Sequence, residues 1–143
     1  MNLTFWDSNL FIYLIEEVQP FAQQVEQIVF HMRQERRQLI TSALTVCETL
    51  VKPVREQRQD LLQRYQELFA QITVVPIEPT LATTFAQVRA VRGIKTPDAL
   101  QLACALKVNA QHFITNDNRL SGFSHPDLTI YSMPSYLAHF SQS

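Results

Sequence analysis

The chain alternates between short strand-like runs and longer stretches with apolar residues at helical spacing, and this alternation limits the folds open to it. Strands that are separated by helices pair in parallel, because a crossover connection returns the chain to the same end of the sheet. We predict strands at residues 3–6, 39–41, 72–77, 112–115 and 128–131. The pattern therefore predicts an α/β fold: a three-layer sandwich with a central, mainly parallel sheet of about five strands and helices on both faces.

The stretches between these runs are predicted to be helices. We expect them over residues 8–18, 20–37, 55–71, 79–92 and 134–140, with two more that begin at the N-caps Ser42 and Thr96. Pro53 is expected to bend or end the helix that follows Ser42, because proline lacks the backbone N–H that the helix interior uses.

Composition narrows the functional classes. The 143 residues fit a single domain, and 46% hydrophobic against 17% charged residues supply a packed core. A net charge of −1 provides no general attraction to nucleic acid, so any phosphate binding must be local. The chain has 2 glycines, which excludes a glycine-rich phosphate loop. No apolar run reaches the roughly 20 residues of a membrane span, so we expect a cytoplasmic protein. Cys47 and Cys104 are predicted to be buried free thiols.

Four acidic residues stand where the predicted elements would aim carboxylates at one end of the sheet. Asp7 follows the first strand and Asp117 closes the fourth, while Glu48 and Asp98 lie in predicted helices. In parallel α/β sheets, ligands bind beyond the carboxyl ends of the strands. Like charges gathered there repel one another unless protons or cations neutralise them, and a set of oxygen ligands favours Mg²⁺ or Mn²⁺.

Each acid also has a simpler structural interpretation. Asp7 could cap a helix, Asp98 could complement a helix dipole in the first turn, Asp117 could form a turn, and Glu48 could face solvent. The combination favours a functional cluster, because Asp7 and Glu48 have apolar neighbours in sequence and such places are unfavourable for an idle charge.

The segments around these acids resemble the successive motifs of the PIN-domain nucleases. The similarity spans the whole chain in the family's order, and it is closest to the VapC-type toxins of prokaryotic toxin–antitoxin pairs. One difference is Ser8, where family members often have threonine. The segments are residues 7–9, 41–53, 96–103 and 113–120.

The resemblance implies a PIN-like fold and hydrolysis of RNA phosphodiester bonds with one or two divalent ions, Mg²⁺ or Mn²⁺. It implies that the metal ligands and catalytic residues are Asp7, Glu48, Asp98 and Asp117. Ser8, Asn9, Thr115 and Asn116 could orient these acids or a water molecule. Because an acidic pocket repels RNA, cations must lie nearby, and Lys52, Lys95 and Arg119 are the candidates closest in sequence to the acids.

A toxin of this kind implies a small antitoxin as its partner. The helices over residues 20–37 and 55–71 could form a homodimer contact and an antitoxin groove, although core packing explains their apolar faces as well. DNA would be contacted only indirectly, through the antitoxin. The alternative is a non-catalytic PIN-like module for RNA binding or assembly. A receiver-type phosphotransfer domain is disfavoured, because its paired early acids and its late lysine are missing.

Overall fold

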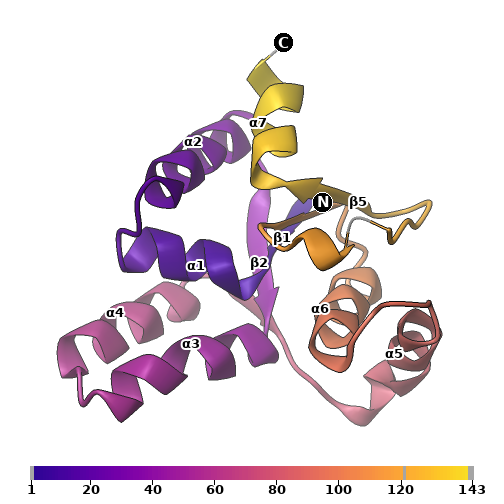
Figure 1. The fold of residues 1–143 in the computed structure, drawn as a ribbon, viewed down its shortest axis with the longest axis horizontal. Coiled ribbons are helices and arrows are strands. Elements are labelled where there is room, and N and C mark those ends of the chain that lie inside the picture. The colour runs from indigo at the N-terminus through magenta and orange to yellow at the C-terminus, as the bar shows by residue number, and fades with distance from the viewer. Residues whose placement is uncertain (1, 121, 142–143) are drawn as a thin grey trace.

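The computed structural model describes residues 2–120 and 122–141, which form a three-layer α/β fold around one parallel sheet (Figure 1). The strand order is β3-β2-β1-β4-β5. All neighbouring strands are parallel, as the alternation of elements predicts. The strands are β1 (Leu3–Trp6), β2 (Gln38–Ser42), β3 (Thr73–Val75), β4 (His112–Thr115) and β5 (Thr129–Ser132).

Helices cover both faces of the sheet. In Figure 1 the first four helices lie to the left of the sheet and α5 and α6 to the right, with α7 at the top. The helices are α1 (Ser8–Ile15), α2 (Phe21–Gln34), α3 (Ala43–Arg55), α4 (Gln59–Ala70), α5 (Ala82–Arg89), α6 (Thr96–Lys107) and α7 (Met133–Ser141). Two short 3₁₀ turns are η1 (Pro79–Leu81) and η2 (Asn118–Leu120). In the part of the chain that is described, no helix has the length and apolar character needed to cross a membrane.

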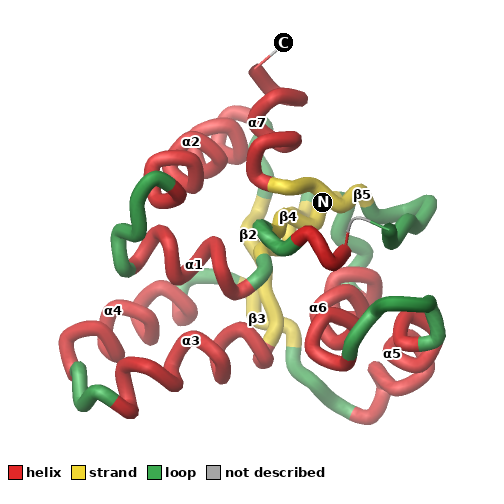
Figure 2. Tube along the Cα trace, viewed as in Figure 1, coloured by secondary structure: helices red, strands yellow, loops and turns green. Residues whose placement is uncertain are grey.

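The direction of chain travel explains the two layers. From β1 the chain steps outward to β2 and then to β3, and afterwards it returns past β1 to β4. Because crossovers between parallel strands are right-handed, reversing the direction of travel moves the connecting helices to the opposite face. Figure 2 shows the connection that leaves β3 and runs to the α5 side. The reversal lies between β1 and β4, and their carboxyl ends border a crevice.

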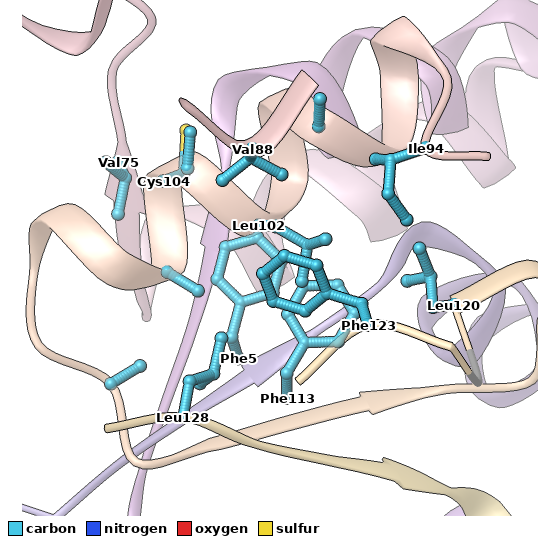
Figure 3. Close-up of a cluster of buried hydrophobic side chains, with 14 of the residues drawn as sticks. Phe5, Val75, Val88, Ile94, Leu102, Cys104, Phe113, Leu120, Phe123 and Leu128 are labelled. Atoms are coloured by element: carbon cyan, nitrogen blue, oxygen red, sulfur yellow. The ribbon is translucent and has the colours of Figure 1, made fainter. Parts of the chain in front are cut away.

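Each central strand sends alternate side chains into two separate cores. Phe5 and its register partner Phe113 stack with ring centroids 5.0 Å apart on the α5 and α6 side. Figure 3 shows them clustered with Leu102 and Phe123. The next residue of β1, Trp6, faces the opposite core, which α1, α2, α4 and α7 share. All of these side chains except Phe123 have no exposed surface.

Several local predictions differ from the structure. Helix α3 does not end at Pro53 but two residues beyond it, at Arg55, although the proline lacks the backbone N–H that would bond to the carbonyl one turn earlier. The helix predicted over residues 55–71 begins only at Gln59, after a turn in which Gln57 has a φ of 55°. Thr96 does not cap α6: it is the helix's first residue, and the N-cap Lys95 makes no side-chain capping bond. Cys104 is buried, whereas Cys47 is exposed, so the prediction of two buried thiols is wrong for Cys47.

Candidate active site

A cavity of about 370 Å³ lies at the crevice beyond β1 and β4, and all four predicted acids line it. Asp7 directly follows β1 and Asp117 closely follows β4, while Glu48 comes from the second turn of α3 and Asp98 from the first turn of α6. Helices α1 and α3 pack against each other, and Figure 1 shows their first turns side by side. The remaining lining residues are Ser8, Asn9, Ile12, Pro97, Gln101 and Arg119.

Asp7 is the most tightly positioned of the acids. Its backbone N–H donates to the carbonyl oxygen of Ile114 at 3.0 Å, which continues the pairing of β1 with β4 beyond the strand. Its Oδ2 accepts a 2.7 Å hydrogen bond from the Thr115 hydroxyl, and its Oδ1 accepts a 2.8 Å bond from the Ser8 N–H as the N-cap of α1. Asp7 therefore has both the capping role and the place in the cavity that its sequence position predicts.

Ser8 and Gln101 connect Asp7 to α3. The Ser8 hydroxyl donates to Glu48 Oε1 at 2.8 Å, so the otherwise exposed Glu48 is oriented from α1. Gln101 is buried, and its Nε2 donates to Thr45 Oγ1 at 2.7 Å and more weakly, at 3.4 Å, to Asp7 Oδ1. Its Oε1 accepts a bond from Ser42.

Gln101 is a site residue that the sequence analysis did not single out. Its spacing of three residues from Asp98 places both on one face of α6. A polar residue among Ala99, Leu102 and Ala103 was the available signal.

Asp98 and Asp117 share a cation. Arg119 Nε donates to Asp117 Oδ2 at 2.7 Å and lies 3.9 Å from Asp98 Oδ2. The Arg119 N–H also donates to Asp117 Oδ1 at 2.9 Å. Arg119 was predicted to bind RNA; in the structure it is paired with the acids, and its RNA contact stays a prediction.

The charges of the acids influence one another. Burial raises the pKa of Asp7, and the charge of Asp117 adds to the rise, although hydrogen bonds from Thr115, the Ser8 N–H and Gln101 act in the opposite direction. Burial also raises the pKa of Asp98 despite Arg119, with Asp117, Asp7 and Glu48 contributing. The hydrogen bond from Arg119 holds the pKa of Asp117 below its usual value. The fold thus brings carboxylates together without fully compensating them.

The donors around the cavity suit a hard divalent cation. Carboxylate oxygens come from all four acids, and Asn9 adds a buried Oδ1 for which no partner is found among the described residues. Yet within the described ranges no three His, Cys, Asp or Glu side chains are close enough together to form a ready metal site. The residue types therefore fit Mg²⁺ or Mn²⁺, but the ligands are not assembled in this arrangement.

The other predicted residues lie at varying distances from this cavity. Asn116 donates to the Tyr13 hydroxyl at 3.0 Å, a contact that turns it toward α1 rather than toward Asp117. Lys52 lies one turn beyond Glu48 on α3 and pairs with Glu16 at 2.7 Å. Lys95 is exposed three residues before Asp98. No contact of these two cations with the four acids is found in the residues described.

A second hollow, of about 350 Å³, lies between α5, α6 and the segment from Phe123 to Asp127. It has an apolar floor that includes Val88 and Leu106, and Asp127 and His125 stand among its polar lining. With one carboxylate it lacks the charge density of the first cavity. The cavity between β1 and β4 is therefore the stronger candidate for chemistry.

Comparison with solved structures shows the same fold in several prokaryotic complexes. VapBC2 from Rickettsia felis, solved bound to a DNA fragment from its promoter, is 14% identical, with 91% of this chain and 98% of that chain covered and a TM-score of 0.67. A toxin–antitoxin complex from Klebsiella pneumoniae is 20% identical, with coverage of 88% and 95% and a TM-score of 0.66. FitAcB from Neisseria gonorrhoeae is also 20% identical, with coverage of 91% and 97% and a TM-score of 0.64.

No curated protein matches the sequence closely enough to count as a relative. The family model of the PIN domain matches residues 4–126, which includes every acid of the cavity. By this match, and by the parallel fold whose crevice gathers the four acids, the chain belongs to the PIN domain family.

Proposed function

We propose that this protein is a divalent-metal-dependent ribonuclease and the toxin of a VapBC-type toxin–antitoxin pair. The observation that carries the proposal is the meeting of Asp7, Glu48, Asp98 and Asp117, from four separate segments of a PIN-domain chain, around one cavity. The similar folds of the VapBC complex from Rickettsia felis and of the Klebsiella pneumoniae toxin–antitoxin complex support the toxin assignment.

The four carboxylates would hold Mg²⁺ or Mn²⁺ beside the scissile phosphate. When bound, such an ion makes a water molecule a better nucleophile at neutral pH and offsets the charge on the departing oxygen. Thr115, Ser8 and Gln101 donate to the carboxylates and restrict their rotation. Hydrolysis would leave a 5′-phosphate and a 3′-hydroxyl, and Lys52, Lys95 and Arg119 are the proposed contacts for the RNA backbone.

The antitoxin and a second copy of the chain need exposed apolar surface. Val51 and Val54 on α3 are 48% and 62% exposed and border a shallow apolar hollow with Leu50. Phe30 on α2 is 57% exposed. The adjoining valines of α3, and not the helix predicted over residues 55–71, offer a contiguous apolar surface for the proposed antitoxin groove or homodimer contact, and Phe30 adds an exposed apolar group on α2, within the helix predicted over residues 20–37.

Cleavage of RNA tests the enzymatic part. The purified protein should cleave total cellular RNA with Mg²⁺ or Mn²⁺ present, and excess chelator should abolish this cleavage. The alternative, a non-catalytic RNA-binding or assembly module, predicts RNA binding without cleavage under every metal condition. Undiminished cleavage in chelator would contradict the metal mechanism.

Bacterial growth tests the toxin part. Expression of the wild-type protein alone should arrest growth, and co-expression of the cognate antitoxin should restore it. Asp7→Asn should relieve the arrest at an equal protein level. Normal growth with active, folded wild-type protein would favour a nuclease without a toxin role.

A further inference from the structure

Arg119 occupies the position in which a cation would satisfy two of the four acids. Its backbone N–H and its guanidinium take both carboxylate oxygens of Asp117, with Nε 2.7 Å from Oδ2 and the backbone nitrogen 2.9 Å from Oδ1. The same Nε lies 3.9 Å from Asp98 Oδ2. A single side chain thus supplies positive charge where the proposed function places a metal ion.

The arginine side chain in this contact is much more exposed to solvent than the two carboxylates. The side chains of Asp98 and Asp117 are 9% and 20% exposed, whereas that of Arg119 is 59% exposed. The neighbouring Leu120 is buried and anchors η2 to the core. The guanidinium can therefore leave the acids by rotation of its own side chain, while the acids and the backbone of η2 stay in place.

The pairing also bears on why no ready metal site is present among the described residues. A carboxylate with both oxygens engaged by an arginine cannot turn toward its neighbours. Asp117 is held in this way by Arg119, and Asp7 is held by Thr115 and by its capping bond. Departure of the guanidinium frees Asp117 Oδ2 for another cation, while Oδ1 keeps its bond from the Arg119 backbone N–H.

We propose that Arg119 is an internal competitor of the divalent ion: it neutralises Asp117 and Asp98 while no metal is bound, and metal binding requires its departure. The inference rests on the proposed metal site. It assigns Arg119 the role of a counter-charge to the acids, separate from RNA contact. A consequence is that metal affinity is lower than the four carboxylates alone would provide, so the site fills only when the metal concentration is sufficient.

The experiment measures Mg²⁺ and Mn²⁺ binding without RNA, by calorimetry and by the shift of the melting temperature. Arg119→Gln should bind the metal roughly fivefold more tightly than wild type, because an exposed ion pair of this kind contributes at most about that factor. Arg119→Lys, which keeps the charge but loses the fork of donors, should lie between them. The control is Arg92→Gln, which removes the same charge from an exposed arginine that does not line the cavity, and it should bind metal as wild type does.

Equal or weaker metal binding by both Arg119 variants, with normal binding by wild type, would overturn the competition and leave the proposed nuclease site intact. Absence of metal binding in every protein would contradict the metal site itself and the inference with it. Binding by Arg119→Gln alone would be the strongest support, since Arg119 would then block the site completely. The folded state of each variant is checked by the cooperativity of its thermal transition.

Discussion

Helix α1 has a carboxylate at each of its caps, and the pKa values of the two groups move in opposite directions. Asp7 at the N-cap has a raised pKa, because burial outweighs its hydrogen bonds. Glu16 at the C-cap is also partly buried, but hydrogen bonds from Lys52 and Tyr65 hold its pKa below the usual value. The helix dipole alone would favour the reverse, since it stabilises negative charge at the start of a helix and disfavours it at the end.

The partners of the two groups explain the difference. Glu16 accepts from the Lys52 ammonium at 2.7 Å and from the Tyr65 hydroxyl at 2.6 Å, so a cation compensates its charge. The donors to Asp7 are all neutral: the Thr115 hydroxyl, the Ser8 N–H and the Gln101 amide. Neutral donors fix the direction of a carboxylate but leave much of its charge uncompensated. The charge at the C-cap of α1 is therefore compensated within the fold, whereas the charge at the N-cap stays largely uncompensated, as the proposed metal site would require at a cost in stability.

The largest expected effect is a difference in RNA cleavage between a substitution of a cavity acid and a substitution of Glu16. Asp98→Asn should lower the rate of RNA cleavage by on the order of 10³-fold, because an amide removes one anionic ligand and several kcal/mol of stabilisation from the metal-assisted step. Glu16→Gln should keep cleavage within about threefold of wild type, since Glu16 lies outside the cavity. Initial rates with saturating Mn²⁺ measure both. Wild-type turnover by Asp98→Asn would remove Asp98 from the site.

The next largest effect should be a loss of metal affinity when a neutral hydrogen-bond donor to Asp7 is removed. Thr115→Val should weaken metal binding about 10- to 100-fold, the usual range for the loss of a group that orients a ligand. The hydrogen bond from Thr115 lowers the pKa of Asp7, so its removal raises that pKa further and metal binding should require a higher pH. Calorimetric titration across pH measures this shift. Thr129→Val, at an exposed position on β5, is the matched control, and an equal loss in both variants would contradict the role of Thr115.

At the C-cap of α1, loss of a hydrogen bond to Glu16 should lower the free energy of unfolding. Tyr65→Phe removes a hydrogen bond to Glu16 from a fully buried ring and should cost about 1–2 kcal/mol of unfolding free energy at pH 7. Because the folded-state pKa of Glu16 is lowered, its contribution is present above the unfolded pKa of about 4.3 and is lost as the pH falls through the folded value. Urea unfolding at pH 7 and pH 3 should show the cost of the substitution shrinking in acid.

A double-mutant cycle sharpens this result. In the Glu16→Gln background, Tyr65→Phe should cost clearly less than in wild type, because the charged acceptor is already absent. Equal costs in the two backgrounds would mean that the ring, and not its bond to Glu16, is what the substitution disturbs.

The smallest expected effect is a gain of stability when one of the four cavity acids loses its charge. Asp98→Asn should raise the melting temperature slightly in chelator at pH 7, because asparagine is isosteric and removes a buried charge together with its repulsion from the other three acids. The folded-state pKa of Asp98 is raised, so the native protein binds more protons than the unfolded chain, and wild-type stability falls as the pH rises from about 4 through the folded value. The gain should therefore be absent at pH 3. A lower melting temperature at pH 7 would show that Arg119 compensates Asp98 fully.

Much of this architecture could be predicted because it depends on local periodicity. The predicted bounds of the fourth strand are those of β4, and the alternation of strands and helices predicts the parallel three-layer fold that the structure has. That Asp7 and Asp117 lie near each other follows from parallel pairing of β1 with β4, since the carboxyl ends of parallel strands meet at one edge. Helix boundaries were less accurate, because tertiary contacts decide where a turn replaces the last helical residues.

The sequence by itself determined the class of the fold and which carboxylates could meet, because strand periodicity and chain order are properties of neighbouring residues. Only the tertiary structure decided how deeply each carboxylate is buried and which groups donate hydrogen bonds to it. Gln101 reaches Ser42 and Thr45 because α6 passes close to β2 and α3, and Lys52 meets Glu16 because α3 packs along α1. Arg119 turns back onto Asp117 and Asp98. The burial of each carboxylate and the charge around it depend on groups that are distant in the chain. A local sequence pattern therefore cannot predict them.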